Sequence, residues 1–444
     1  MKQLKVGDTV TTDQGTFKVM KCIGEGGQGK VYRIASDGKA YALKWFHQAL
    51  ATQAQFTTIE TLVEMGAPDG RFIWPISIAQ TDSEESFGYV MPLIDQQKYQ
   101  KLTRYFSGEI TFEKQTHLIE ACMQLVHSFY ALHMKGLCYR DISFGNIFVE
   151  LATGNIQICD NDNVTYDNLT SPEDNWGTYG FMAPEIVRGE APPSTTTDLF
   201  SLSVVLFRML YKQHPLQGRR EVEIDILDEA ANQMLYGQHP VFIFDPIDET
   251  NRPVKNIKDI AVKYWEQTPD TLNDLFVRAF TEGLTSPEYR VRESEWMKAL
   301  TILKGQLLYC TNCGKERYYH PNDIKIKHQL RACPHCGTKQ FLLPPRMKLE
   351  DRVIMLNHDT VLSQNQLRPL DMEAYLKPFA RVIQHPRHPN IWGLKNASDD
   401  KWTYHKMQGE EQQIEREGVI PMKQGLMIDF NGTMGLVRLS VKQE

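Results

Sequence analysis

An aspartate and an asparagine lie five residues apart in the segment Tyr139–Asn146. Phosphoryl transfer needs a carboxylate that orients the acceptor hydroxyl and oxygen ligands for the magnesium that neutralises the phosphates; Asp141 and Asn146 could take these two roles. Fourteen residues further on, Asp160 follows the run Ile156–Cys159, which is predicted to be a strand. A carboxylate at a strand end is well placed to complete a metal site, so these residues predict a centre for phosphoryl transfer.

A glycine-rich segment near the N-terminus could hold the phosphates of a nucleotide. Gly24, Gly26 and Gly29 have G-x-G-x-x-G spacing, and Val31 follows two residues later. Without side chains, such a loop can lie close to phosphates and direct backbone N–H groups at them. In dinucleotide-binding folds this spacing joins a strand to a helix, whereas here a second strand is predicted after it, which favours an ATP-binding loop. A simple glycine-rich turn is the alternative.

A lysine closes the apolar run that follows this loop. Lys44 comes fifteen residues after Gly29, at the end of Tyr41–Leu43. Because burying an unpaired charge is costly, a lysine on a buried strand needs an anionic partner, and ATP phosphates would supply one. A lysine that simply reaches water from the strand end is the alternative.

Four of the eight cysteines form two C-x-x-C-G groups, in which Cys310 pairs with Cys313 and Cys333 with Cys336. Tetrahedral zinc takes four such ligands, and a glycine after each pair permits the tight turn that surrounds them. We therefore expect a structural zinc ribbon. A redox pair would need a thioredoxin-like strand and helix around one group, and the presence of two matched groups argues against it.

The elements that must position these residues form a β-rich first part and a helical second part. One helix, about Gln53–Met65, is predicted to interrupt the strands, and Asp37-Gly38 has the composition of a hairpin turn. Apolar residues spaced by three and four over Phe112–His133 predict a helix, and helices continue to about residue 305. The predicted strands are Phe17–Gly24, Lys30–Ser36 and Ala40–Phe46.

The composition describes an ordinary globular protein of several domains. At 444 residues the chain is too long for a typical single core. A formal net charge of -6 offers no broad basic field, so no nucleic-acid role is expected. The sequence has neither a run of about 18 apolar residues nor a signal peptide pattern, so we expect a cytoplasmic protein without a membrane role.

These features together resemble the eukaryotic-type (Hanks-type) protein kinases, including their bacterial members, over about residues 17 to 304. The resemblance implies a two-lobed fold, protein substrates, and ATP with Mg²⁺ or Mn²⁺ as cofactors. In this family's pattern Asp141 is the catalytic base and Lys44 contacts the α- and β-phosphates, while Asn146 and Asp160 ligate magnesium.

The resemblance also implies where the rest of the nucleotide binds. Met91 would be the gatekeeper, and Pro92 to Ile94 the hinge that contacts adenine. A proline is compatible with the first hinge position because it keeps its carbonyl, while Ile94 retains its N–H. The remaining positions implied to bind the nucleotide are Gly24, Gly26, Gly29, Val31, Ala42, Lys44 and Glu60.

Later landmarks of the family follow in the expected order. The segment Gly177–Glu185 resembles the end of the activation loop, which supports the peptide substrate. In this pattern Thr178 braces Asp141, and Arg290 pairs with Glu185. Because this pairing belongs to the peptide-binding form, protein substrates are preferred to small molecules.

The chain departs from the family at three points. Asp160-Asn161-Asp162 replaces the usual Asp-Phe-Gly, and Ser143 replaces the lysine of serine/threonine kinases. An ungapped match puts Thr58 where a helix glutamate should pair with the strand lysine. Glu60 is chosen for this role, with Glu64 nearby, and a solvated glutamate is the alternative.

The tail after Pro344-Pro345 is predicted to consist of short strands. Two of its runs, Trp392–Asn396 and Gly425–Phe430, resemble the later strands of forkhead-associated (FHA) domains, which bind phosphothreonine; a plain β-sandwich adaptor is the alternative. An FHA-like domain would add phosphoprotein partners to the protein substrates.

The predicted fold class is α+β: a two-lobed kinase fold, then a small zinc ribbon and a β-sandwich-like domain. The predicted function is a serine/threonine protein kinase in which the ribbon and the β domain recruit partners. A pseudokinase scaffold, which binds nucleotide and partners without efficient catalysis, is the alternative. The predicted domains are the N-lobe 1–94, the C-lobe 95–305, the zinc ribbon 306–342 and the β-rich domain 343–444.

Overall fold

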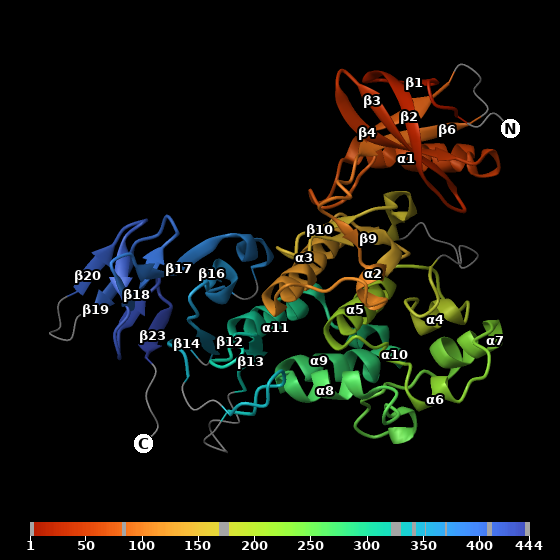
Figure 1. Ribbon diagram of the computed structural model, residues 1–444. Helices are drawn as coiled ribbons and strands as arrows, with labels where there is room; N and C mark the ends of the chain where they lie inside the picture. The colour runs from red at the N-terminus through yellow and green to blue at the C-terminus, as the bar shows by residue number, and fades with distance from the viewer. Residues whose placement is uncertain are drawn as a thin grey trace.

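A computed structural model shows a β-rich N-terminal lobe, a helical C-terminal lobe, a small Cys-rich hairpin region and a second β domain, in chain order (Figure 1). Parts of the predicted zinc ribbon, 321–329 and 340–342, lie outside the described residues. The structure describes residues 4–81, 86–167, 177–320, 330–339, 343–350, 352–368, 371–405 and 411–439.

The N-terminal lobe is a closed antiparallel barrel with strand order β1-β2-β3-β4-β6-β5. Alternate residues of the strands point inward, so that Val19, Ile34 and Leu43 are fully buried in one apolar cluster. The turn between β3 and β4 uses positive φ at Asp37 (49°) and Gly38 (77°), which confirms the predicted hairpin. The strands are β1 Thr9–Thr12, β2 Gly15–Glu25, β3 Gly29–Ser36, β4 Lys39–Phe46, β5 Ser77–Gln80 and β6 Phe87–Pro92.

Helix α1, Gln53–Met65, covers the barrel and has the bounds predicted from the sequence. It begins where the Thr52 side chain accepts a hydrogen bond from the backbone N–H of Gln55, and it buries Ile59 and Leu62. After it, the chain crosses to the C-terminal lobe, where the backbone of residues 71–73 pairs with Ile158 over 2.8 and 2.9 Å. This crossing fastens the strand before Asp160 to the segment that follows α1.

The C-terminal lobe is built on two long buried helices, α3 Gln115–His133 and α5 Thr195–Tyr211. Aromatic rings fill the space between α5 and the later helices; for example, Phe207 meets Phe276 at 5.2 Å. A small sheet, β7 Gln100–Lys101, β9 Ile147–Val149 and β10 Ile156–Ile158, lies on the side of the N-terminal lobe. Figure 1 shows these elements between the barrel and the helices.

The remaining elements of this lobe are mostly short. They are α2 Thr103–Phe106, β8 Leu137–Cys138, η2 Phe144–Asn146, η3 Asn161–Asn163, β11 Thr165–Tyr166, α4 Pro184–Val187, α6 Arg219–Val222, α7 Glu229–Asn232, a π-helix Gln233–Gln238, η6 Glu249–Asn251, α8 Asp259–Gln267, α9 Asp270–Phe280, α10 Glu282–Thr285, η7 Pro287–Tyr289 and α11 Glu293–Gly305. The described helices contain none long and apolar enough to cross a membrane.

The Cys-rich region starts with the hairpin β12 Leu307–Tyr309 and β13 Glu316–Tyr318. Its Glu316 accepts a hydrogen bond from the backbone N–H of Thr116 (3.0 Å), at the start of α3. A carboxylate at this position compensates the positive end of the helix dipole. The hairpin is therefore attached to the C-terminal lobe by a helix-capping contact.

The last domain is a sandwich of two antiparallel sheets, which confirms the predicted β-rich tail. One sheet has the order β15-β14-β23-β22-β19-β20 and the other β16-β17-β18-β21. Phe379, Trp402 and Phe430 pack edge to face between the sheets. The strands are β14 Arg346–Leu349, β15 Arg352–Met355, β16 Val361–Ser363, β17 Pro378–His385, β18 His388–Asn396, β19 Trp402–His405, β20 Glu411–Ile414, β21 Val419–Pro421, β22 Met427–Asp429 and β23 Met434–Arg438.

A short helix of this domain, η9 Met372–Leu376, packs against the C-terminal lobe. Met372 and Tyr375 are buried in the same apolar cluster as α3 and α11. The Arg71 guanidinium donates a 2.6 Å hydrogen bond to the Tyr375 hydroxyl, and the His127 ring lies 5.1 Å from the Tyr375 ring. The main hydrophobic core thus extends past the predicted boundary at residue 342.

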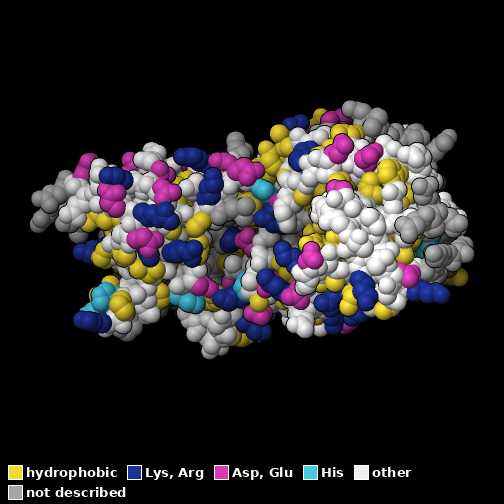
Figure 2. All heavy atoms as spheres, turned by 90° about the horizontal axis from the view of Figure 1, so that it is seen from above, with side chains coloured by type: hydrophobic (Ala, Val, Ile, Leu, Met, Phe, Trp, Pro, Cys, Tyr) yellow, Lys and Arg dark blue, Asp and Glu magenta, His cyan; other side chains and the backbone are white. Residues whose placement is uncertain are grey.

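The charges on the face seen in Figure 2 are mixed. Lysine and arginine side chains are interspersed with aspartate and glutamate there, and none of the visible surface is a field of one sign. Protein surfaces that bind nucleic acid without base contacts rely on such a field. The absence of a nucleic-acid role stays a prediction.

Candidate active site

A cavity of about 640 Å³ opens between the two lobes, a size typical of small-molecule sites. The β2–β3 loop covers it, β4 and β6 form its upper wall, and the loops around Asp141 and Asp160 form its floor. The residues predicted to bind the nucleotide that line it are Gly24, Gly26, Gly29, Val31, Ala42, Lys44, Met91, Pro92 and Ile94.

The glycines of the β2–β3 loop serve two different purposes. A Cβ at Gly29 would lie 2.2 Å from the carbonyl oxygen of Trp45, so this position needs glycine for β3 to pair with β4. A Cβ at Gly26 or Gly27 would meet no atom within 4 Å. The loop therefore leaves open space above the cavity, where phosphates could approach the backbone.

Asp141 is held from both sides by hydrogen bonds. The Thr178 hydroxyl donates to its Oδ1 (2.9 Å) and the Asn146 amide to its Oδ2 (3.1 Å). The predicted brace from Thr178 is thus confirmed. The loop before it is anchored on Asp198, whose carboxylate accepts the backbone N–H groups of Tyr139 (2.5 Å) and Arg140 (3.2 Å).

Asp198 is also bound to His133 of α3, at 3.2 Å from Nε2, while the other ring nitrogen contacts Glu293. Burial alone would lower the pKa of His133, but its hydrogen bonds with Asp198 and Glu293 raise it to about 9. The ring is therefore charged at neutral pH and joins two buried carboxylates. This triad fixes the start of α5 beneath the catalytic loop.

Asp160 supplies carboxylate oxygen atoms on the floor of the cavity, and the amide of Asn146 is bound to Asp141 there. Asp160 has a left-handed backbone (φ 56°), and its side chain is 44% exposed. The Asn146 amide nitrogen donates to Asp141, which leaves the amide oxygen as the atom that could ligate a cation. Carboxylate and amide oxygens are the donors that Mg²⁺ prefers, so these residues fit the predicted metal site.

Lys44 is paired with Asp162, at 2.8 Å from each carboxylate oxygen. The Asp162 side chain is fully buried and also accepts a 2.9 Å hydrogen bond from the Tyr89 hydroxyl, while Asp160 lies 3.5 Å from the same Nζ atom. Burial alone would lower the pKa of Lys44, but Asp162 and Asp160 raise it above its ordinary value. Lys44 is therefore a buried cation that Asp162 holds inside the cavity.

Glu60 is not the partner of Lys44 in this structure, and that pairing was wrong. Glu60 is exposed and borders a different hollow, which is lined by β1, α1 and β5. The reason is helical geometry: the barrel side of α1 is taken by Ile59 and Leu62, and successive helix residues are about 100° apart around the axis. The acid that pairs with Lys44 comes instead from the loop after β10.

Asn161 stands where the family pattern has an aromatic residue, and it forms hydrogen bonds in place of apolar contacts. Its fully buried amide donates to the carbonyl oxygens of Ile73 (2.8 Å) and Ile158 (3.2 Å). These are the two backbones that pair where the chain crosses between lobes. Asn161 thus joins the metal-binding loop to the segment after α1, at a position where the family uses apolar packing.

Gln28, at the tip of the glycine-rich loop, occupies the phosphate side of the cavity. Its amide oxygen accepts a 2.7 Å hydrogen bond from Lys44, and its amide nitrogen donates to Asn163 over 3.3 Å. Gln28, Asn163 and Asp162 were not predicted as site residues. A polar residue inside a glycine-rich loop, and two acids around an asparagine, mark these positions in the sequence but do not reveal their partners.

The segment before α4 is held in place by the predicted ion pair. Arg290 donates to both carboxylate oxygens of Glu185 at 2.8 Å, which is the strong bidentate arrangement. The carbonyl of Phe181 accepts a 2.7 Å hydrogen bond from Ser201 on α5. The shelf that would support a peptide is therefore tied to both α5 and the end of the lobe.

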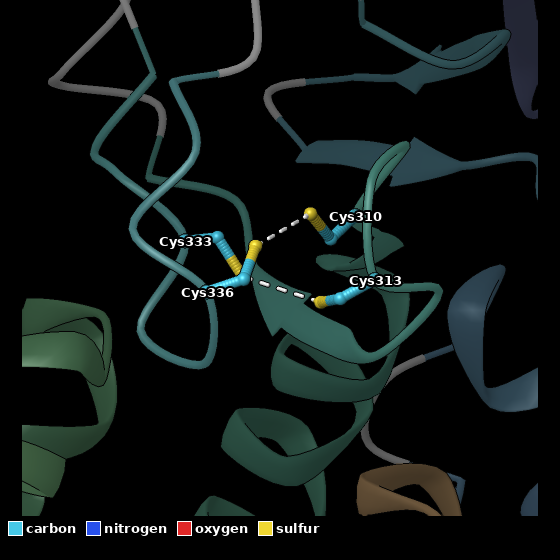
Figure 3. Close-up of side chains that lie close together, drawn as sticks. All are labelled: Cys310, Cys313, Cys333 and Cys336. Atoms are coloured by element: carbon cyan, nitrogen blue, oxygen red, sulfur yellow. Dashed lines mark hydrogen bonds between the residues drawn. The ribbon is translucent and has the colours of Figure 1, made fainter.

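The four cysteines of the C-x-x-C-G groups lie together, as predicted from their spacing (Figure 3). Sulfur separations are 3.7 Å for Cys310 and Cys336 and 3.8 Å for Cys313 and Cys333. Ligands about 2.3 Å from a tetrahedral zinc ion are about 3.8 Å apart. Hydrogen bonds with Thr338 lower the pKa of Cys336 to about 5, which favours a thiolate.

Comparisons with known proteins agree with this geometry. The protein kinase domain family matches residues 17–282, which is more than half of the chain. Similar curated proteins include beta-adrenergic receptor kinase 1 of Mesocricetus auratus, 28% identical over 225 residues, and ribosomal protein S6 kinase alpha-4 of Mus musculus, 27% identical over 235 residues. G protein-coupled receptor kinase 2 of Caenorhabditis elegans is 25% identical over 221 residues.

These matches cover 47% of this chain and 31%, 28% and 30% of the respective relatives. The chain thus spans about a third of the length of the curated relatives it matches. A kinase domain implies ATP and Mg²⁺, for which the cavity has the binding groups. On the family match, and on Lys44, Asp141 and Asp160 in one cavity with Asn146 bound to Asp141, the chain belongs to the protein kinase family.

Proposed function

We propose that this protein transfers the γ-phosphate of ATP to serine or threonine hydroxyls of other proteins. The observation that carries the proposal is one cavity that holds Lys44 on its wall and Asp141 and Asp160 on its floor, with Asn146 bound to Asp141. Phosphoryl transfer depends on positioning and charge stabilisation, which these groups can supply. The roles of the individual residues stay predictions.

In this mechanism Asp141 accepts a hydrogen bond from the substrate hydroxyl and takes up its proton as the hydroxyl oxygen bonds to the γ-phosphorus. The bond from that phosphorus to the bridging oxygen of ATP breaks in the same step, and ADP leaves. Lys44 contacts the phosphates of the substrate ATP, which replace Gln28 on its Nζ atom. Asn146 and Asp160 would hold magnesium, which neutralises the charge of the phosphates. Thr178 and Asn146 keep the Asp141 carboxylate pointing toward the acceptor.

Serine and threonine are favoured as acceptors because the peptide shelf lies close to the base. Thr178 belongs to the segment that leads to this shelf, and its hydroxyl binds Asp141 directly. The similar proteins named as receptor and ribosomal protein kinases support protein substrates.

The test is incubation of the purified protein with magnesium ATP and a generic protein substrate, with phosphosites mapped by mass spectrometry. Wild type should add phosphate to serine or threonine, and Asp141→Asn should add little. Equal phosphate in both proteins would show that Asp141 is not the base. Nucleotide binding without any transfer would favour the pseudokinase scaffold, which the Lys44–Asp162 pair also permits.

We further propose that the Cys310, Cys313, Cys333 and Cys336 cluster holds structural zinc. The support is the sulfur spacing and the four-thiolate donor set. Metal analysis of purified protein should give one zinc per chain, and Cys333→Ser should lose it. A stoichiometric iron content with visible absorption would identify a different metal.

We also propose that the Cys-rich region with the β12–β13 hairpin and the C-terminal β sandwich position protein partners. The phosphoprotein hypothesis rests on the resemblance of Trp392–Asn396 and Gly425–Phe430, which lie in and around β18 and β22. Fluorescent peptides that differ only in threonine or phosphothreonine would test it by their affinity for the whole chain. Equal affinity for the two peptides would contradict the FHA-like hypothesis and favour the plain β-sandwich adaptor.

A further inference from the structure

A half-buried arginine lies beside the catalytic loop, within a group of three aromatic rings. The guanidinium carbon of Arg208, on α5, is 4.3 Å from the centre of the Phe144 ring. The rings of Phe106 and Phe181 are each 5.0 Å from it. Phe106 and Phe144 are themselves stacked at 3.7 Å, so they form one continuous wall.

No carboxylate pairs with Arg208 among the residues that the structure describes. Ring faces attract a cation but do not accept the in-plane N–H bonds of a guanidinium, which has five donors. Burial lowers the pKa of Arg208 to about 10. Arg208 is only half buried, and none of its nitrogen atoms is among the buried polar atoms without a partner in the described residues, so its N–H groups are open to an anion.

A second cation follows one helical turn later. Lys212 ends α5, with its Nζ atom 4.7 Å from the centre of the Tyr105 ring, and burial lowers its pKa as well. In the described part of the chain it too has no carboxylate partner. Both cations lie at the C-terminal end of α5, where the helix dipole favours positive charge, and ring contacts hold them there.

By contrast, the neighbouring Arg104 on α2 is a paired surface residue. Its Nε donates to Glu109 over 2.9 Å, and both side chains are about half exposed. Arg104 therefore differs from Arg208 because a carboxylate of the same chain, that of Glu109, pairs with it. It offers a matched control of the same residue type on the adjoining helix.

The position of Arg208 relates it to the substrate. Phe144 is three residues from Asp141 in the catalytic loop, and Phe181 is three residues from Thr178, which binds Asp141. The guanidinium thus lies where the catalytic loop meets the peptide shelf.

We infer that Arg208, together with Lys212, recognises an acidic side chain of the protein substrate near the phosphorylated residue. The inference rests on the proposed kinase activity and defines the substrate class of that same site. A carboxylate fits the guanidinium because both are planar and can form two parallel hydrogen bonds. Aspartate or glutamate in the substrate would supply the anion that the chain itself does not.

The test uses the whole protein and a set of serine peptides that carry glutamate, glutamine, lysine or phosphoserine at single positions around the acceptor. At the preferred position, kcat/KM for glutamate should exceed that for glutamine by roughly tenfold or more. This preference should shrink at high salt. Arg208→Gln should remove it and Arg208→Glu should favour lysine, while Arg104→Gln should leave it unchanged.

The outcomes separate the two levels of the proposal. If no peptide is phosphorylated although ATP binds, the kinase proposal fails and this inference with it. If peptides are phosphorylated without charge preference, only the Arg208 assignment is overturned. An equal loss of kcat/KM for all peptides in Arg208→Gln would show that Arg208 supports the packing of the lobe and does not recognise the substrate. A preference for phosphoserine over glutamate that depends on Arg208 would show that the site recognises a phosphate group and not a carboxylate.

Discussion

Removing the buried charge that faces Lys44 should destabilise the protein and weaken ATP binding. Asp162→Asn keeps the size of the side chain but leaves the Lys44 ammonium without the carboxylate that lies 2.8 Å from it on both oxygens. The Asp162 side chain is 0% exposed and that of Lys44 6% exposed, so water can compensate the lost partner only in part. The change therefore isolates a charge inside the cavity.

The size of the effect follows from what remains around Lys44. Breaking a buried ion pair from one side costs roughly 3–5 kcal/mol. Asp160 at 3.5 Å and the Gln28 oxygen at 2.7 Å still compensate part of the charge. We therefore expect a loss at the lower end, about 3 kcal/mol, which for a unit of this size corresponds to a fall in melting temperature of about 3–5 °C.

The assay is thermal unfolding followed by fluorescence, together with ATP titration of the same samples. Two control variants carry the same kind of change at nearby acids. Glu60→Gln should have the wild-type melting temperature because Glu60 is exposed and remote from Lys44. Asp160→Asn should melt near wild type, since its side chain is 44% exposed, yet lose phosphoryl transfer.

The reasoning would be refuted if Asp162→Asn melted and bound ATP like wild type. It would be refuted equally if Glu60→Gln lowered the melting temperature as much as Asp162→Asn, because the helix glutamate would then carry the function assigned to the loop aspartate. A lower melting temperature with unchanged ATP affinity would show that Asp162 stabilises the barrel without orienting Lys44.

Three further results are expected. His133 has a pKa of about 9 in the fold against an ordinary 6.5, so its contribution to stability is complete below about pH 6.5 and is lost as the pH rises to 9. The free energy of unfolding should therefore fall by about 3 kcal/mol over that range. His133→Gln should flatten this part of the plot of unfolding free energy against pH. Tyr375→Phe should cost about 1–2 kcal/mol and speed hydrogen exchange of residues 69–74, because the Arg71 guanidinium loses its hydroxyl acceptor; unchanged exchange would contradict the contact. Chelation of the proposed zinc should expose the described residues around the four cysteines, 307–320 and 330–339, to protease while ATP binding persists, and simultaneous loss of ATP binding would mean that the β12–β13 hairpin supports the catalytic lobe.

Local patterns predicted most elements of the two lobes, because the signals lay within short windows. The bounds of α1 and the turn at Asp37-Gly38 depend on apolar spacing and on glycine, both visible in the sequence. The order of the landmarks gave the position of Asp141 relative to Thr178, and that of Glu185 relative to Arg290. Those contacts are present.

The choice of acid for Lys44 could not be made from the sequence. Glu60 and Asp162 are both acids within reach of a lysine in principle, and the decision depends on which face of α1 meets the barrel. That face was set by Ile59 and Leu62 packing on residues distant in the chain. The pairing of Arg71 with Tyr375, 304 residues apart, has no local signal at all.

This contact has a consequence for how the protein is made. On the ribosome, Arg71 emerges 304 residues before Tyr375, which at about 5–20 residues per second is about 15–60 s of translation. Throughout that interval the nascent lobes lack Met372 and Tyr375, which complete their apolar core. The residues of the cavity are made before the surface that encloses their lobe, which is complete only once Met372 and Tyr375 have emerged. A chain that stalls before these two residues would leave the apolar side chains that they cover exposed to chaperones and proteases.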